Sequence, residues 1–328
     1  MTRPGGETVR ERGSDAEAPA SGRPAPCGGV GAWVLAARPK TLPAAAAPVL
    51  LGTACAWAVG GFKAGPAAAA LAGALLLQIA ANLVNDVADF QAGTDTAARL
   101  GPLRVTQAGL LTPRQVWGGA AVVLTATCAV GAALAAVAGW PVLALGGAAI
   151  LAALAYSVGP YPLARHGLGE PFVMGFFGFA AVAGTAYVQA LRVPAAAWWG
   201  GLVAGAFATA ILVVNNTRDH ATDRAAGRRT VPARWGRAAG VVEYGLLLFL
   251  AYLGTVGMVV AGAAPRAALA ALATAPLAVR LARRLATRAD GPSANQVLAG
   301  TGGLLLLHCL LLAAGLLLGG GGGGVSGP

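Results

Sequence analysis

The sequence has little charge and few thiols for its length. Charged residues make up 11% of the 328 residues, and lysine occurs only twice, at Lys40 and Lys63. The four cysteines form no C-x-x-C pair and no spacing typical of a metal site, so we assign them no role. Hydrophobic residues make up 57% of the chain, and its mean hydropathy is +0.68. This composition excludes an ordinary soluble domain.

Long apolar stretches recur through the chain and predict an all-α polytopic membrane protein. A bilayer core is crossed by about 20 apolar residues in a helix. We predict about nine membrane-spanning helices around a central cavity, in a single domain that covers residues 31–318. The predicted spans lie at roughly 43–60, 65–85, 116–138, 141–158, 171–190, 195–215, 240–262, 265–285 and 296–318.

The basic residues predict an orientation. With a cytoplasmic N-terminus, only Lys63, Arg192 and Arg266 fall outside, and the other 20 of 23 basic residues fall on the cytoplasmic side. This bias follows the positive-inside rule, so we read the net charge of +11 as topology and expect no nucleic-acid partner. We predict a multi-pass protein of the inner (plasma) membrane, surrounded by membrane lipid, with its N-terminus and active-site loops in the cytoplasm.

The two ends of the chain differ from the rest. Residues 1–30 are rich in Gly, Pro, Glu and Arg and contain no apolar core of a signal peptide. We predict a disordered N-terminal tail there. Residues 319–328 are Gly-rich, and we predict a flexible C-terminal tail.

Two polar motifs lie at the ends of apolar segments. In the first, NLVNDVADFQAGTD (82–95), Asn82, Asp86 and Asp89 share one helical face. We expect Gly93 to end the helix and Asp95 to reach the same site from a loop. In the second motif, NNTRDHATD (215–223), Asn215, Asp219 and Asp223 are spaced four and four residues apart, which again places them on one helical face.

The chemistry of the motifs indicates a divalent cation that faces a polyanion. A carboxylate at membrane depth costs about 2.5–3.5 kcal/mol, so a cluster of them needs partners. Carboxylate and amide oxygens suit Mg²⁺, which usually bridges a few carboxylates to substrate phosphates. Arginines follow each motif, at Arg99 and Arg104 and at Arg228 and Arg229. Together these groups form a consistent site for a diphosphate.

The apolar surroundings indicate a lipid-borne substrate. A polyprenyl diphosphate would place its head group at the acidic motifs and its hydrocarbon tail between helices. An allylic C–O bond ionises when the charge on the leaving diphosphate is stabilised. The carbocation that results would attack an electron-rich acceptor.

The motifs resemble those of a known family. The sequence is similar to the UbiA superfamily of intramembrane prenyltransferases, and within it to the 1,4-dihydroxy-2-naphthoate polyprenyltransferases of menaquinone synthesis. The resemblance covers about residues 36–236. Its matching stretches are ARPKTLPAAAAPVLLGTA (37–54), NLVNDVADFQAGTDTAARLGPLRVTQAG (82–109), YSVGPYPLARHGLGE (156–170), the FFGF–GT–YVQ run (176–189) and NNTRDHATDRAAGRRT (215–230).

This resemblance implies a UbiA-like fold, a Mg²⁺ cofactor and prenylation that replaces the acceptor's carboxyl group, which leaves as CO₂ and gives demethylmenaquinone. It implies the metal ligands Asn82, Asp86, Asp89, Asp95, Asn215, Asp219 and Asp223. The predicted diphosphate-binding residues are Asn82, Asn215, Lys40, Arg99, Arg104, Arg218 and Arg228. The predicted catalytic residues are Asp86, Asp89, Asp219, Asp223, Tyr156 and His166.

The loop near residues 156–170 supplies the last two candidates. The π face of Tyr156 can stabilise an allylic cation, although tyrosines also gather at membrane interfaces without a catalytic role. His166 is the basic side chain best placed to deprotonate an acceptor hydroxyl. Arg165 and His220 depart from the family pattern. Two interpretations stay open: they alter the preference for the acceptor, or they are neutral changes on a cytoplasmic loop.

Three alternatives stay open. A UbiA-type enzyme can take another aromatic acceptor, or cyclise the diphosphate without an acceptor. From a different class, a transporter also has polar groups at helix ends. A transporter would more often carry ionisable groups near the midplane and paired broken helices, whereas here they cluster on one side.

Overall fold

The structure is a computed structural model that describes residues 28–93, 101 and 103–320. These residues form helices joined by turns and loops, with no β-strand among them. In chain order the elements are α1 (Val30–Ala37), η1 (Pro39–Thr41), α2 (Leu42–Trp57), α3 (Ala64–Gln91), α4 (Pro113–Ala138), α5 (Trp140–Ser157), η2 (Leu163–Arg165), α6 (Gly169–Val173), η3 (Met174–Ala180), α7 (Ala181–Ala190), α8 (Ala195–Ala225), α9 (Val231–Trp235), α10 (Arg237–Val260), η4 (Arg266–Thr274), α11 (Ala275–Thr287) and α12 (Gly291–Gly320).

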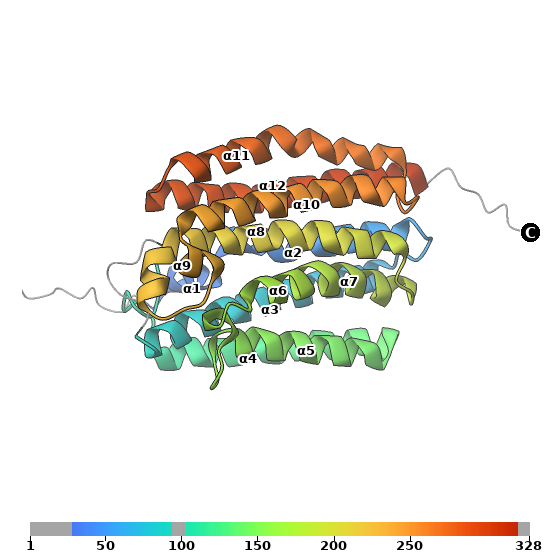
Figure 1. The fold of residues 1–328 in the computed structure, drawn as a ribbon. Coiled ribbons are helices and arrows are strands. Elements are labelled where there is room, and N and C mark those ends of the chain that lie inside the picture. The colour runs from blue at the N-terminus through green and yellow to red at the C-terminus, as the bar shows by residue number, and fades with distance from the viewer. Residues whose placement is uncertain (1–27, 94–100, 102, 321–328) are drawn as a thin grey trace, which may run out of the picture.

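The long helices lie side by side in one bundle, and the short helices α1 and α9 are both at the same end of it (Figure 1). Helix α8 is central and packs against α2, α10, α12 and η3. Its side chains are mostly buried, whereas those of α5 at the edge are mostly exposed. An all-apolar helix is expected inside a bundle when other helices cover every face of it.

Seven helices are long and apolar enough to cross a membrane: α3, α4, α5, the continuous run from α6 to α7, α8, α10 and α12. The predicted all-α membrane fold is therefore confirmed, but the count of nine is not. The other two predicted spans correspond to α2, which has 16 residues, and to η4 followed by α11. Helix α11 carries three arginines, so no long apolar window exists there.

Small residues let α8 approach its neighbour closely. The segment η3 is a π-helix, and a Cβ on its Gly178 would lie 2.4 Å from the carbonyl oxygen of Gly201 on α8. A Cβ on Gly205 would lie 2.6 Å from the sulfur of Met174. Close backbone contact through small residues is a general mode of helix packing in membranes.

A buried polar cluster joins η4 to α10 and α12. His308 is fully buried, and its Nε2 and Nδ1 atoms each lie 2.9 Å from a threonine hydroxyl, on Thr255 and Thr274 respectively. The Tyr252 hydroxyl lies 2.8 Å from that of Thr274. Because buried polar groups are costly without partners, this network fixes how the three elements pack.

Helix α3 ends where the sequence predicts. Helix α3 ends at Gln91, and Gly93 has a positive φ of 66°, which favours glycine after a helix. Helix α8 continues through the second motif as far as Ala225. At the C-terminus α12 extends to Gly320, two residues into the predicted flexible tail. The predicted N-terminal tail lies outside the described residues as far as residue 27.

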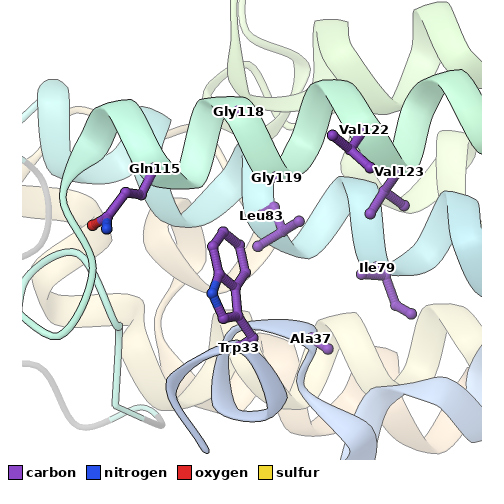
Figure 2. A pocket seen from close by; sticks show the side chains of 9 residues that line it. All are labelled: Trp33, Ala37, Ile79, Leu83, Gln115, Gly118, Gly119, Val122 and Val123. Atoms are coloured by element: carbon purple, nitrogen blue, oxygen red, sulfur yellow. The ribbon is translucent and has the colours of Figure 1, made fainter. Parts of the chain in front are cut away.

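An apolar groove of about 540 Å³ lies between α1, α3 and α4. Figure 2 shows the ring of Trp33 directed from α1 toward Leu83 of α3 and Gly119 of α4. A Cβ on Gly119 would lie 2.4 Å from that ring, so the glycine makes room for the indole. This groove does not include the acidic motifs, and the predicted central cavity stays a prediction.

Candidate active site at the ends of helices α3 and α8

Asp89 of α3 and Asp223 of α8 lie beside one guanidinium group. Arg228, just beyond the end of α8, lies 3.6 Å from a carboxylate oxygen of Asp89 and 3.5 Å from one of Asp223. A second arginine, Arg104, bonds the other oxygen of Asp89 at 2.5 Å. The structure therefore brings one carboxylate from each motif to the same place, with arginines between them.

The remaining polar residues of the second motif gather around Arg218. Its guanidinium donates to both oxygens of Asp219, at 2.8 and 2.5 Å, and to Oδ1 of Asn215 at 2.6 Å. It also donates to Oδ1 of Asn295 on α12, at 2.7 Å. Arg218 is buried, so its charge is matched by Asp219 within the same helix turn.

Asp86 has different partners from Asp89, although both belong to the first motif. Its carboxylate accepts hydrogen bonds from the backbone N–H groups of Val105 and Thr106, at 3.2 and 3.0 Å. Arg38 lies 3.6 Å from the same carboxylate. Asp86 is almost fully buried at 1% exposure, and it fastens the 105–106 backbone to α3.

Asn82 lies one turn earlier on α3 and binds the segment after α1. Its amide nitrogen donates to the carbonyl oxygen of Ala37 at 2.9 Å and to Oγ1 of Thr41 at 3.0 Å. Its amide oxygen accepts from Gln78 at 3.3 Å. These contacts hold the Arg38-containing turn beside Asp86.

Two pairs that the sequence analysis did not assign complete the polar end of the bundle. Asn85, four residues before Asp89, accepts a hydrogen bond from Ser157 at 2.5 Å. Asn216 donates to Glu170 of α6 at 2.8 Å. The Asn85–Asp89 spacing equals the Asn215–Asp219 spacing, and that repeat is the signal that could have identified Asn85.

Tyr156 lies within this charged region, near the end of α5. The charges of Glu170, Arg228, Asp89 and Asp223 all act on its hydroxyl group. A Cβ on Gly169 would lie 3.3 Å from that hydroxyl oxygen, so α6 passes directly beside it. The structure thus places Tyr156 next to both acidic motifs.

The loop after α5 places His166 in a stacked pair. The His166 ring lies 3.4 Å from the ring of Tyr161, centroid to centroid, and its Nδ1 lies 2.9 Å from the carbonyl oxygen of Pro162. The backbone N–H of Arg229 donates to the carbonyl oxygen of Arg165 at 2.9 Å, which ties this loop to the one that carries Arg228. His220 bonds the carbonyl oxygen of Thr217 within α8.

Of the predicted site residues that the structure describes, Lys40 is not brought into the cluster. Lys40 is exposed in η1, and none of the ion pairs within the described part of the chain involves it. Asp95 and Arg99 lie outside the described residues.

The donor atoms at this site fit Mg²⁺. Asp89 and Asp223 offer hard carboxylate oxygens at one place, as their shared contact with Arg228 demonstrates. Within the described ranges, no group of three His, Cys, Asp or Glu side chains could hold a metal ion. A site with only two protein carboxylates is typical of Mg²⁺, because this ion retains waters and substrate phosphate oxygens as its other ligands.

Comparison with known proteins identifies the family. Residues 45–312 match the UbiA prenyltransferase family. The chain belongs to that family. The family match and the seven long apolar helices of the described chain indicate together that the protein is an integral membrane protein.

Curated relatives carry one name. The chain is 41% identical over 211 residues to the 1,4-dihydroxy-2-naphthoate octaprenyltransferase of Escherichia coli, and this match covers 62% of this chain and 68% of that protein. It is 39% identical over 282 residues to the 1,4-dihydroxy-2-naphthoate octaprenyltransferase of Mycobacterium tuberculosis, and this match covers 84% of this chain and 93% of that protein.

Solved structures support the fold. A UbiA homolog from Archaeoglobus fulgidus bound to GPP and Mg²⁺ superposes with a TM-score of 0.63 at 15% identity, covering 88% of this chain and 99% of that one. The apo structure of a UbiA homolog from Aeropyrum pernix gives a TM-score of 0.63 at 18% identity, with 83% and 97% covered. At these identities the likeness concerns the fold alone.

Proposed function

We propose that this protein transfers a polyprenyl group from polyprenyl diphosphate to 1,4-dihydroxy-2-naphthoate, with loss of CO₂ and diphosphate, giving demethylmenaquinone. The observation that carries the proposal is the shared contact of Asp89 and Asp223 with Arg228. It matches what a diphosphate site needs: acidic oxygens for a cation and an arginine for the phosphate. The names of the relatives, at up to 41% identity, supply the acceptor.

In this proposal Mg²⁺ is the cofactor, and the carboxylates of Asp89 and Asp223, which share Arg228, hold it. Asp219 is a further candidate from the second motif. Asn85, Asn215 and Asp95 are further candidates for oxygen ligands. The chemistry that Mg²⁺ supplies when bound is stabilisation of the charge on the leaving diphosphate.

Asn82 and Asp86, which the sequence also assigns to the metal, receive a different role in this proposal. Their polar atoms are engaged with the turn after α1 and with the 105–106 backbone. They hold Arg38 and the loop that carries Arg104 in place beside the diphosphate. They therefore position charged groups rather than touch the metal.

The arginines change partners during the reaction. Arg104 and Arg228 neutralise Asp89 and Asp223 before substrate binds, which avoids unpaired carboxylates at this depth. When the diphosphate arrives, these guanidinium groups bind its oxygens, and bidentate phosphate contacts suit them well. Arg218 remains bonded to Asp219 and Asn215 and sets their orientation.

The acceptor reacts on the side of α5 and α6. The ring of Tyr156 faces the allylic cation that forms as the C–O bond breaks. His166 removes the proton from an acceptor hydroxyl, which raises the electron density of the ring, and returns it after the new C–C bond forms. Attack at the carboxyl-bearing carbon cannot restore aromaticity by proton loss. The bond to the carboxylate therefore breaks, and CO₂ leaves its electron pair in the ring.

In this proposal the protein resides in the plasma membrane, with the ends of α3 and α8 on the cytoplasmic side. Both substrates then reach the site from that side, the prenyl diphosphate through the lipid phase and the acceptor from the cytoplasm. The positive charge of the loops at this end supports the orientation.

The stoichiometry of the products tests the function. Purified protein is incubated with Mg²⁺, polyprenyl diphosphate and dihydroxynaphthoate that is isotopically labelled in its carboxyl group. We expect labelled CO₂, diphosphate and prenylated product in equal amounts, and none of them without Mg²⁺. Diphosphate release with the label retained would point to another acceptor or to a cyclase. Transport of substrate without diphosphate release would contradict the enzyme assignment.

A further inference from the structure

Helix α11 lies at the edge of the bundle and has two different faces. It packs against α10 and α12, and in Figure 1 its outer side has no neighbouring helix. The inner face carries buried apolar side chains, Ala278, Leu281 and Leu285. The outer face carries three exposed arginines, Arg280, Arg283 and Arg284, and a fourth, Arg288, follows the end of the helix.

A groove on the outer surface of α11 combines apolar and cationic groups. It has a volume of about 600 Å³ and is lined by Ala275, Pro276, Val279, Arg280 and Arg283. The apolar residues occupy the first turns of the helix, and the two arginines follow them. The groove therefore has an apolar end and a cationic end.

The cationic end of the groove faces the end of the bundle that carries the acidic motifs. Arg237, at the start of α10, donates to the carbonyl oxygens of Leu285 and Arg288, so the end of α11 lies beside the start of α10. At 1.5 Å per residue, Arg280 lies about 10 Å and Arg283 about 6 Å before the end of α11. Side chains at these depths reach the head-group level of a bilayer by extending along the helix.

Arg280 and Arg283 are exposed on a helix that packs mainly against α10, α12 and η4, and basic side chains at the level of the head groups attract anionic lipids. Within the described ranges, no carboxylate forms an ion pair with Arg280 or Arg283. The surrounding bilayer contains phosphate groups at the level that these side chains reach, next to hydrocarbon chains at the level of Val279 and Pro276. This order of chemical groups is the order along a phospholipid.

We propose that the outer groove of α11 is a binding site for one anionic phospholipid. The guanidinium groups of Arg280 and Arg283 bind the lipid phosphate and head group, and one acyl chain lies along Ala275, Pro276 and Val279. Arg284 and Arg288 add positive potential beside the head group. A second copy of the chain does not fit this surface, because the two sets of arginines would repel each other.

Lipid binding to the purified protein tests this site. Native mass spectrometry in detergent would compare dioleoylphosphatidylglycerol, which is anionic, with dioleoylphosphatidylcholine, which is zwitterionic. We expect the wild type to prefer phosphatidylglycerol. The double variant Arg280→Gln, Arg283→Gln should bind it about thirtyfold more weakly, the factor that corresponds to about 1 kcal/mol per arginine near an anionic head group.

A matched control removes two charges elsewhere. Arg114 on α4 and Arg192 between α7 and α8 are exposed and lie away from α11 (Figure 1), so Arg114→Gln, Arg192→Gln should keep the affinity of the wild type. The variant Arg280→Lys, Arg283→Lys preserves the positive charge and should retain most of the binding. It provides a second test in case the glutamine variant folds poorly. Equal losses in the glutamine variant and the control, or no preference of the wild type for phosphatidylglycerol, would overturn the proposal. These outcomes do not depend on prenyl transfer.

Discussion

Each carboxylate of the two acidic motifs in the described chain lies beside an arginine. This arrangement explains how so many charges can be buried in an apolar protein, since an unpaired carboxylate at this depth is costly. It also supplies, in the same place, the two kinds of group that a metal diphosphate needs. The pairs are Asp86 with Arg38, Asp89 with Arg104 and Arg228, Asp219 with Arg218, and Asp223 with Arg228.

Arg228 and its neighbour Arg229 provide a matched test of diphosphate binding. Arg228 contacts both motifs, whereas the side chain of Arg229 is exposed. A hydrogen bond to a charged group contributes about 1.5–3 kcal/mol. We therefore expect Arg228→Gln to lower kcat/KM for the prenyl diphosphate by about tenfold to a hundredfold, and Arg229→Gln to change it less than about threefold. Similar effects of the two substitutions on steady-state kinetics would contradict the role of Arg228.

Asp86 and Asp89 should respond differently to the same substitution. Asp86→Ala leaves two buried backbone N–H groups without their acceptor, which should lower the free energy of unfolding by about 1–3 kcal/mol. Asp89→Ala removes the carboxylate beside the buried Arg104, so it should also lower the stability, but its main effect should be to lower turnover at least a hundredfold, about 2.7 kcal/mol in the barrier. Thermal unfolding in detergent and the Mg²⁺ dependence of turnover measure the two effects. An Asp86→Ala protein with normal stability and a higher Mg²⁺ requirement would identify Asp86 as a metal ligand instead.

The sequence could predict which residues are polar and on which helix, but not which of them meet. Asn82, Asp86 and Asp89 share one helical face, and periodicity alone could not separate them. Their partners come from the 105–106 loop and from Arg228, at distances along the chain that no local pattern encodes. The spacing of Asn85 from Asp89 could have singled out Asn85, but its contact with Ser157 on another helix could not be predicted from a local pattern.

At the scale of the helix, length and apolar character were predictable, and helix type was not. The segment after residue 265 begins as the 3₁₀-helix η4 and becomes the amphipathic α11. Thr274, at the junction, bonds both Tyr252 and His308. These tertiary contacts fix the junction, so the hydropathy of the segment alone predicted a plain membrane span there.

Two glycines of the π-helix η3 test how tightly it packs on α8. A Cβ on Gly178 would lie 2.4 Å from the backbone oxygen of Gly201, whereas a Cβ on Gly175 would have no neighbour within 4 Å. Inserting a methyl group into a close contact typically costs about 1–3 kcal/mol. We expect Gly178→Ala to lower the temperature of thermal unfolding and Gly175→Ala to leave it nearly unchanged. Equal melting temperatures for the two variants would contradict the close packing of η3 and α8.

At the scale of the whole molecule, the bundle places both acidic motifs at one end. The sequence predicted this from the distribution of basic residues, because loops on the same side of a membrane alternate along the chain. The prediction depends on whether the number of spans between the two motifs is odd or even, and less on the total number of spans in the protein. Helices α4, α5 and the run from α6 to α7 lie between α3 and α8, so α3 and α8 point the same way, whether or not α2 and α11 cross the bilayer.

The orientation of α3 gives the last prediction. Lys63, just before α3, and Ala226, just after α8, are both exposed. About 26 residues separate Lys63 from Asp89, which corresponds to about 39 Å of helix and exceeds the bilayer core of about 30 Å. Cysteine at position 63 should therefore react with an impermeant thiol reagent outside intact cells, in a background without the native cysteines. Cysteine at position 226 should react only after permeabilisation. Labelling of position 226 from outside would place the acidic motifs on the outer face and contradict a cytoplasmic active site.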